Sequence, residues 1–329
     1  MRKIPLNLFG MAFGTAGLGG TWLTAAAQGY APEAVAIVLL VIAAVLWAVV
    51  LGFYATYAIG QRALVKDLVD PIGSPFAALA LITPMLVAGQ TLPRPAATVV
   101  VDVFAALILV HGSWFTGQLM YAGGLDFDKL HPGYFLPSAA GGFVAAASAG
   151  TVGQHEFGVV LLGFGIVSWL ILGSMILGRL IFRPPLPDAL MPTVAIEIAP
   201  AAVASLGYFA LFGDRIDTVT ALLGGYGLLM VLAQVRMLPR YLKLRFTVGF
   251  WAFTFAWAGV ATAALHWLNW EHPAGQAVWT YLVLAAITAL IGAIAVRTAI
   301  GLLRNTLLPA PAPDPLPAGV DRPTVGDAG

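Results

Sequence analysis

The sequence predicts an all-helical integral membrane protein with ten membrane-spanning helices. Of its 329 residues, 60% are hydrophobic and only 9% are charged, whereas soluble domains carry about 25% charged residues. The apolar residues fall into ten segments, each near the roughly 20 residues that a helix needs to cross the hydrocarbon core. Basic residues concentrate in alternate connections, as they do in multi-pass membrane proteins.

Charged residues or clusters of Pro and Gly bound the ten segments. They are 5–27, 32–59, 74–91, 95–121, 132–151, 157–181, 192–212, 216–237, 246–267 and 275–303. The first follows Arg2 and Lys3, as the apolar part of a signal peptide would, but its length is that of a membrane helix. The ten spans make up a predicted channel domain, 1–303. The Pro-rich stretch 304–329 is predicted to be a disordered cytoplasmic tail.

The distribution of Lys and Arg predicts the orientation. If the N-terminus is cytoplasmic, all of the 16 Lys and Arg residues except Arg94 and Arg215 fall in cytoplasmic segments. An even number of spans also places both termini inside. We therefore expect a multi-pass protein of the inner cell membrane with two cytoplasmic ends. The densest basic cluster, Arg236 to Arg245, fits this topology and lies where it could attract anions or acidic lipid.

Helix-breaking residues favour the odd-numbered segments. Pro84, Pro137 and Pro200 lie inside the third, fifth and seventh segments. The first segment has several glycines instead, Gly14 among them, and Gly259 lies in the ninth. An interior proline removes a backbone hydrogen bond, and in lipid the freed carbonyl must meet protein or water. The pattern predicts an inner set of kinked helices around a pore and an outer set of regular helices. The alternative is an ordinary bundle in which these prolines are packing kinks.

Motifs for catalysis are absent, and no cofactor or metal site is expected. With no cysteine, thiolate sites are excluded, and a net charge of +1 gives no reason to expect a nucleic-acid partner. His111 and Asp102, in the fourth segment, are interpreted as structural polar residues. Gly10 and Gly14 form a GxxxG pattern that permits close helix packing.

Among the few ionisable residues predicted to lie within the membrane, the most notable is Glu197, in the seventh segment one turn before Pro200. A charge there costs about 2.5–3.5 kcal/mol, so such residues usually face a cavity or a partner. One interpretation is a proton-coupling or selectivity site. The other is a neutral, hydrogen-bonded structural glutamate.

Phe255 lies midway along the ninth segment. Mid-membrane aromatic residues usually pack against helices or lipid, but a hydrophobic constriction can also gate ions by dewetting. The small residues Ala252, Ala256 and Gly259 would let this helix approach a central axis. Phe255 is therefore a candidate gate.

Four motifs together resemble the tellurite-resistance/dicarboxylate transporter family, which includes bacterial tellurite-resistance proteins and the slow-type anion channels of plant guard cells. They occur in the family's order and at its spacing over about residues 5–303. The motifs are Phe9-Gly10-x-x-x-Gly14, His131-Pro132-x-x-x-x-Pro137, Gly225-Tyr226-Gly227 with Arg236-x-x-Pro239, and Gly249-x-Trp251-Ala252-Phe253-Thr254-Phe255.

This resemblance implies five helical hairpins with quasi-five-fold symmetry, whose odd helices surround a pore. It implies a homotrimer with one pore per protomer, which passes small anions such as chloride and nitrate. The family's gating phenylalanine falls on Phe255. Two departures are Ala256, where some relatives have proline or glycine, and Glu197, where relatives have an aliphatic residue.

The function predicted is therefore an anion channel or channel-like transporter, and not an enzyme. The alternative within transport is a proton-coupled carrier of a weak acid such as malate or sulfite, with Glu197 as its proton site. The alternative of another class is a sensory or structural membrane protein with no conduit.

Overall fold

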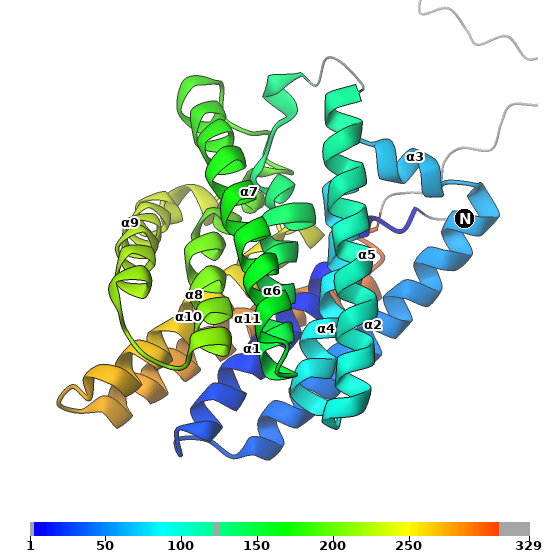
Figure 1. Ribbon diagram of the computed structural model, residues 1–329. Helices are drawn as coiled ribbons and strands as arrows, with labels where there is room; N and C mark the ends of the chain where they lie inside the picture. Colours follow the sequence, from blue (N-terminus) through cyan, green and yellow to red (C-terminus); the bar gives the residue numbers. More distant parts are fainter. Residues whose placement is uncertain (1–2, 122–125, 309–329) are drawn as a thin grey trace, which may run out of the picture.

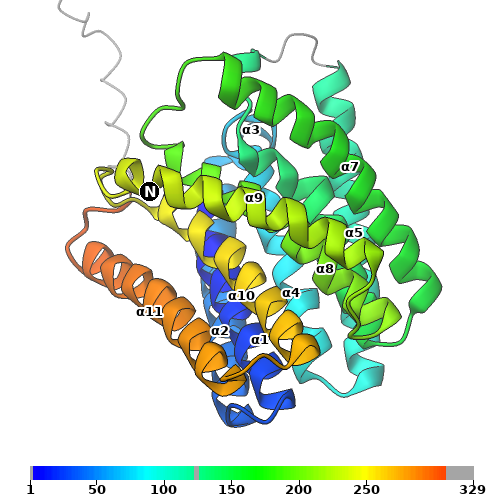
Figure 2. The ribbon, with the colours of Figure 1, turned by 90° about the vertical axis from the view of Figure 1, so that its left-hand side faces the viewer.

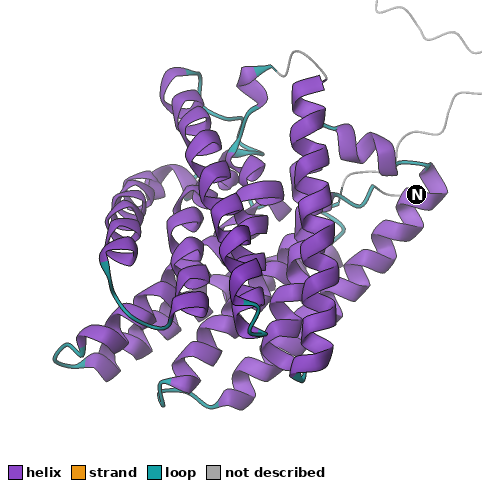
Figure 3. Cartoon of the chain, viewed as in Figure 1, coloured by secondary structure: helices purple, strands orange, loops and turns teal. Residues whose placement is uncertain are grey.

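A computed structural model describes residues 3–121 and 126–308 of the chain. These residues form helices joined by short loops, and no strand occurs among them (Figures 1 and 3). Eight of the helical segments in these ranges are long and apolar enough to cross a membrane. The chain is thus a membrane protein of several apolar helices.

Five helices form an inner set. They are α1 (Gly10–Ala27), α4 (Ala78–Thr91), α6 (Gly141–Thr151), α8 (Ala199–Phe212) and α10 (Ala252–Glu271). Neighbours in this order contact one another, and α10 contacts α1, so the contacts close into a ring. In the most apolar 18-residue stretch of Met191–Phe212, the segment that contains α8, 78% is buried.

The outer set consists of the five helices that follow these in the chain. They are α2 (Glu33–Gln61), α5 (Arg94–Tyr121), α7 (His155–Phe182), α9 (Thr218–Tyr241) and α11 (Gln276–Leu303). Each contacts the inner helix that precedes it (Figures 1 and 2). In the most apolar 18-residue stretch of α9, only 11% is buried. The outer helices therefore present apolar faces of the kind that lipid or another subunit covers.

Every inner helix is preceded by a tighter or wider helical turn. Segments of 3-10 helix lead into four of them, and a 3-10 turn followed by a π turn leads into α6. They are η1 (Leu6–Phe9), η2 (Ser74–Ala77), η4 (Pro132–Phe135) with η5 (Leu136–Ala140), η6 (Met191–Ile198) and η7 (Val248–Trp251). Such segments are normally three or four residues long, so the eight residues of η6 are unusual.

The predicted segments coincide with these helices once the 3-10 and π turns that lead into the inner ones are included, and their ends then differ by at most four residues. Pro84 lies inside α4, as expected. Pro137 lies in the π turn before α6, and Pro200 in the first turn of α8, where a proline interrupts no hydrogen bond of the helix. The expectation that the outer helices are all regular was wrong, because α9 continues past the predicted end at 237 to Tyr241 and includes Pro239.

A short helix that the sequence pattern did not indicate, α3 (Leu64–Val69), lies where the inner helices begin. The link from α3 to η2 is fixed by buried His131, whose Nε2 lies 3.1 Å from the Ile72 carbonyl oxygen. Its Nδ1 accepts a hydrogen bond from the Gly133 N–H at 3.1 Å. Burial lowers the pKa of His131 to about 4, so the ring is neutral at pH 7 and Nε2 is the donor.

We name the two ends of the bundle by their side chains. The basic end is the one at which the inner helices begin and at which Lys3, Arg183 and Arg240 lie; the distal end is where the inner helices finish. At the distal end Asp217 caps α9, and a hydrogen bond from the Tyr208 hydroxyl lowers the pKa of its carboxyl.

The predicted tail lies mostly outside the described residues, which end at Leu308. Its first residues close α11, with the Thr306 N–H donating to the Gly301 carbonyl at 2.9 Å.

The inner helices α1 and α10 approach each other closely. A Cβ atom added at Gly10 would lie 3.1 Å from the Cβ of Trp251, and one at Gly14 would overlap the Thr254 hydroxyl. Farther along, the hydroxyls of Thr21 and Thr262 are 2.8 Å apart. The GxxxG pattern thus does bring two helices into close contact, as the sequence indicated.

We predict that Gly14→Ala destabilises the protein by about 1–3 kcal/mol, because the added methyl group overpacks the contact between α1 and α10. Thermal unfolding in detergent measures the effect. Gly52→Ala on α2 is the matched control, since nothing lies within 4 Å of its added Cβ. Equal stability of the two variants would contradict the close packing.

Candidate functional site

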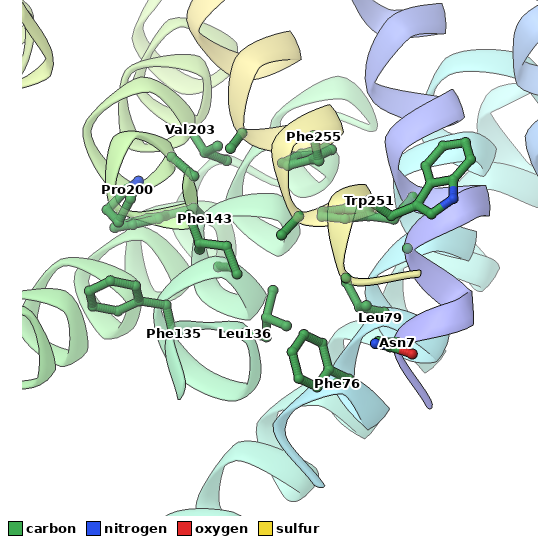
Figure 4. A pocket seen from close by; sticks show the side chains of 18 of the residues that line it. Asn7, Phe76, Leu79, Phe135, Leu136, Phe143, Pro200, Val203, Trp251 and Phe255 are labelled. Atoms are coloured by element: carbon green, nitrogen blue, oxygen red, sulfur yellow. The ribbon is translucent and has the colours of Figure 1, made fainter. Parts of the chain in front are cut away.

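A central cavity of ≈ 50 Å³ lies among the starts of all five inner helices (Figure 4). Aromatic and aliphatic side chains dominate its wall, and none of the described residues that line it is charged. The side chains labelled in Figure 4 are Asn7, Phe76, Leu79, Phe135, Leu136, Phe143, Pro200, Val203, Trp251 and Phe255.

A larger distal cavity of ≈ 290 Å³ lies among the later turns of the same five helices. Its wall is more polar and includes Gln90, Thr151, Asp214, Thr262 and His266. The Asp214 carboxylate and His266 Nδ1 lie 2.7 Å apart, so these two side chains are engaged with each other.

Phe255 is the single described residue that lines both cavities. On each inner helix the residues of the central cavity precede those of the distal cavity: for example Phe13 precedes Ala16, and Val203 precedes Leu206. The inner helices therefore run parallel, and the two cavities lie one after the other along them. Phe255 stands at the boundary.

The Phe255 ring is held by α1. It stacks on Phe13, with ring centroids 3.6 Å apart and an angle of 18° between the planes. A Cβ atom at Gly17 would lie 2.9 Å from the ring, so the absence of a side chain there makes room for it. The stacking and the glycine together fix this aromatic pair between the cavities.

A basic-end pocket of ≈ 190 Å³ continues the line of cavities. It shares Asn7, Phe76 and Gly249 with the central cavity. Lys3 and Asp67 also line it, with 3.4 Å between the Lys3 Nζ and a carboxylate oxygen of Asp67. The pocket, the central cavity and the distal cavity form one row, which we call the conduit, and Phe255 separates its last two members.

Two uncharged amides lie in the conduit on either side of Phe255. The Oδ1 of Asn7 and the Oε1 of Gln90 are buried and have no hydrogen-bond partner among the described residues. The oxygen and nitrogen of a side-chain amide are told apart by their hydrogen-bond partners. Because neither of these oxygens has a partner in the described part of the chain, the orientation of the two amides is not fixed. Each amide can therefore present a donor to an anion.

The other residues singled out from the sequence divide into three groups. Pro200 and Ala252 line the central cavity, and Gly259 lines the distal cavity. Gly14 packs against α10. Pro84 and Pro137 line neither cavity.

Glu197 lies beside the conduit. It lines a separate lateral pocket of ≈ 460 Å³ between α7 and α9, whereas its neighbours Ile196 and Ala199 line the central cavity. Only 2% of Glu197 is exposed, and neither carboxylate oxygen has a hydrogen-bond partner among the described residues.

Sequence reasoning missed Phe13, Asn7 and Gln90. The chain has 18 Phe residues, and no local pattern distinguishes the one that stacks on Phe255. Phe13 does lie between Gly10 and Gly17 on a helix with a glycine face, and that register is the signal that could have found it.

Comparison with known proteins identifies the class. The family model described as SLAC1, voltage-dependent anion channel, matches residues 3–299, so the chain belongs to this family. The chain is 27% identical over 286 residues to the tellurite resistance protein TehA homolog of Haemophilus influenzae. This match covers 85% of the chain and 86% of the relative. The chain is also 27% identical over 164 residues to an uncharacterized transporter of Methanocaldococcus jannaschii, which covers 43% of the chain and 47% of that protein.

The barrier at Phe255 can be tested by thiol accessibility, since the natural chain has no cysteine. We expect a membrane-impermeant anionic methanethiosulfonate to label Ala140→Cys in the central cavity only from the basic end. We expect it to label Leu206→Cys in the distal cavity only from the other side. Adding Phe255→Ala should make both thiols reactive from either side.

Ser174→Cys is the control, because it lies exposed on the outer face of α7, where lipid excludes a charged reagent. Labelling of Leu206→Cys from both sides with Phe255 intact would show that the barrier is elsewhere.

Proposed function

We propose that the protein is an anion channel, or a channel-like transporter, whose pore is the conduit and whose gate is Phe255. In this proposal residues 1–303 form ten membrane-spanning helices, arranged as five hairpins with quasi-five-fold symmetry. The permeant species are small anions such as chloride and nitrate. The observation that carries the proposal is the position of Phe255 between two cavities that are each lined by all five inner helices.

The form of the gate follows from the chemistry of the wall. An apolar constriction sheds water, and an ion cannot pass without its hydration shell unless polar groups replace it. Phe13 and Phe255 offer no such groups. Rotation of the Phe255 side chain away from Phe13 would open the passage with little change in the backbone.

Anion preference is supported by the direction of the inner helices. All five begin at the basic end, so their N-terminal partial positive charges converge on the central cavity. The wall there lacks charged residues, and an uncharged wall lets an ion leave as readily as it enters. Asn7 adds an amide that can donate to the anion.

We further propose a homotrimer in the inner cell membrane, with both termini cytoplasmic and one conduit in each protomer. The orientation is supported by the basic residues, which place the basic end inside. The exposed apolar faces of the outer helices offer surfaces for neighbouring protomers and for lipid.

The competing interpretations rest on weaker observations. A proton-coupled carrier of malate or sulfite would use Glu197, but that carboxylate lines the lateral pocket and neither cavity of the conduit. A sensory or structural bundle without a conduit does not account for cavities on both sides of Phe255. Anion flux that requires a pH gradient and is lost in Glu197→Gln would favour the carrier.

We predict that Phe255→Ala raises chloride and nitrate conductance in planar bilayers by at least about tenfold, because removing the ring joins the two cavities. Tenfold corresponds to about 1.4 kcal/mol off the barrier to permeation. Currents in asymmetric chloride should reverse near the chloride equilibrium potential.

Phe253→Ala is the matched control, since this buried aromatic lies on the same helix and packs on Tyr241, away from both cavities. If Phe255→Ala folds but conducts no better than Phe253→Ala, the hydrophobic gate is refuted.

A second prediction concerns Asn7. In the Phe255→Ala background, Asn7→Leu should lower chloride conductance roughly threefold to tenfold, because it removes a hydrogen-bond donor of about 0.5–1.5 kcal/mol. Asn7→Asp should lower it further by charge repulsion. Bilayer recordings at equal protein density measure both, and unchanged conductance in both variants would exclude Asn7 from the anion path.

A further inference from the structure

The lateral pocket opens on the outside of the bundle, between two outer helices that enclose the segment η6. Leu177 and Leu180 of α7 form one wall, and Met230 and Met237 of α9 form the other. The loop from α7 to α8 meets the end of α9 at the rim of the pocket, where an oxygen of Asp188 lies 3.2 Å from Nη2 of Arg240 (Figure 2). The pocket therefore runs from the basic end into the apolar region of the bundle.

Glu197 forms the inner wall of the pocket, and its carboxylate oxygens lack a hydrogen-bond partner among the described residues. The nearby amide of Gln234 is already engaged: its Nε2 donates to the Val194 carbonyl at 2.9 Å, and its Oε1 accepts from the Tyr241 hydroxyl at 2.5 Å. The guanidinium of Arg179, on the buried face of α7, donates to the carbonyls of Asp128 and Pro184. Neither group contacts the Glu197 carboxylate, and no ion pair or hydrogen bond to it occurs among the described residues.

The rim of the pocket is positively charged, opposite to the Glu197 carboxylate. Arg183 and Arg240 both line the pocket, and their side chains are about half exposed, at 53% and 52%. Each has one aspartate near it, with nitrogen to oxygen distances of 3.7 Å for Asp128 and 3.2 Å for Asp188. A guanidinium has five N–H donors, so both retain donors for a further anionic group.

The apolar walls extend well below this rim. Met230 lies ten residues before Arg240 on α9, a distance of about 15 Å at 1.5 Å per residue. A molecule that suits the whole pocket therefore has a cationic group to pair with Glu197, an anionic group to pair with the two arginines, and a long apolar chain. Free inorganic ions lack this combination. Basic pockets between membrane helices are known to hold lipid headgroups.

We propose that the lateral pocket is a binding site for an aminophospholipid whose primary ammonium pairs with the Glu197 carboxylate. The lipid phosphate lies between Arg183 and Arg240, and an acyl chain runs along Leu180 and Met230. A primary ammonium can donate hydrogen bonds to both carboxylate oxygens, which a quaternary choline cannot.

The site adjoins the wall of the conduit. Within η6, Glu197 faces the lateral pocket and the preceding residue, Ile196, faces the central cavity. A long 3-10 segment holds its residues less firmly than an α-helix does. Lipid bound at Glu197 therefore braces one side of the central cavity, and this holds whichever anion the conduit passes.

The test uses the full-length protein, stripped of lipid in detergent. It is titrated with dioleoyl phosphatidylethanolamine, phosphatidylcholine or phosphatidylglycerol, and bound lipid is counted by native mass spectrometry. We expect wild type to bind phosphatidylethanolamine about tenfold more tightly than phosphatidylcholine, the scale of one hydrogen bond to a charged group. Glu197→Gln should remove this preference, and the double variant Arg183→Ala with Arg240→Ala should weaken all three lipids.

Glu156→Gln is the matched control and should keep the preference, because this exposed glutamate lies in the first turn of α7, at the other end of that helix from the pocket. Ala233→Trp fills the pocket without altering Glu197 and should also lose bound phosphatidylethanolamine, which keeps the test valid if Glu197→Gln folds poorly. Equal binding of the ethanolamine and choline lipids by wild type would overturn the proposal.

Two further outcomes would assign the pocket to another occupant. If soluble phosphoethanolamine bound as tightly as the lipid, the site would recognise a free metabolite and the acyl chain would have no role. If Glu197→Gln dissociated an oligomer while leaving the lipid preference intact, a second copy of the chain would cover the pocket. Either result contradicts a lipid site.

Discussion

The close approach of α1 to α10 is the contact on which the conduit depends. Gly10, Gly14 and Gly17 lie on the face of α1 toward α10, and side chains there would meet Trp251, Thr254 and Phe255. Because the helices touch, the Phe255 ring can lie flat on Phe13 and occupy the axis of the bundle. The indole N–H of Trp251 then anchors α10 to the outer helix α11, through the Thr298 hydroxyl at 2.9 Å. The position of the candidate gate is thus fixed from both sides.

The same geometry explains why the sequence was informative about the fold. Membrane helices must satisfy their backbone internally, so a membrane helix appears in the sequence as an apolar run with recognisable ends. Basic residues then mark one end of the bundle. The prolines identified the inner set for a partly wrong reason: Pro137 and Pro200 lie where 3-10 or π turns join α-helices, and Pro239 belongs to an outer helix.

The site was harder to predict, because it depends on contacts between distant parts of the chain. Phe255 became a candidate through its mid-membrane position and small neighbours, and a family resemblance added to that. Phe13, some 240 residues earlier, carries no local signal of its own. Glu197 illustrates the same limit. Its depth in the membrane could be inferred, but adjacent residues of a 3-10 segment face different spaces, so the sequence could not tell whether it points into the conduit or away from it.

The central claim is that five inner helices enclose a conduit closed at Phe255. An experimental structure of Phe255→Ala in a lipid bilayer tests it most directly. The account predicts that the central and distal cavities merge into one passage while the five inner helices keep their positions. A structure in which the cavities stay separated by other side chains, or in which α1 and α10 move together to fill the space, would contradict it.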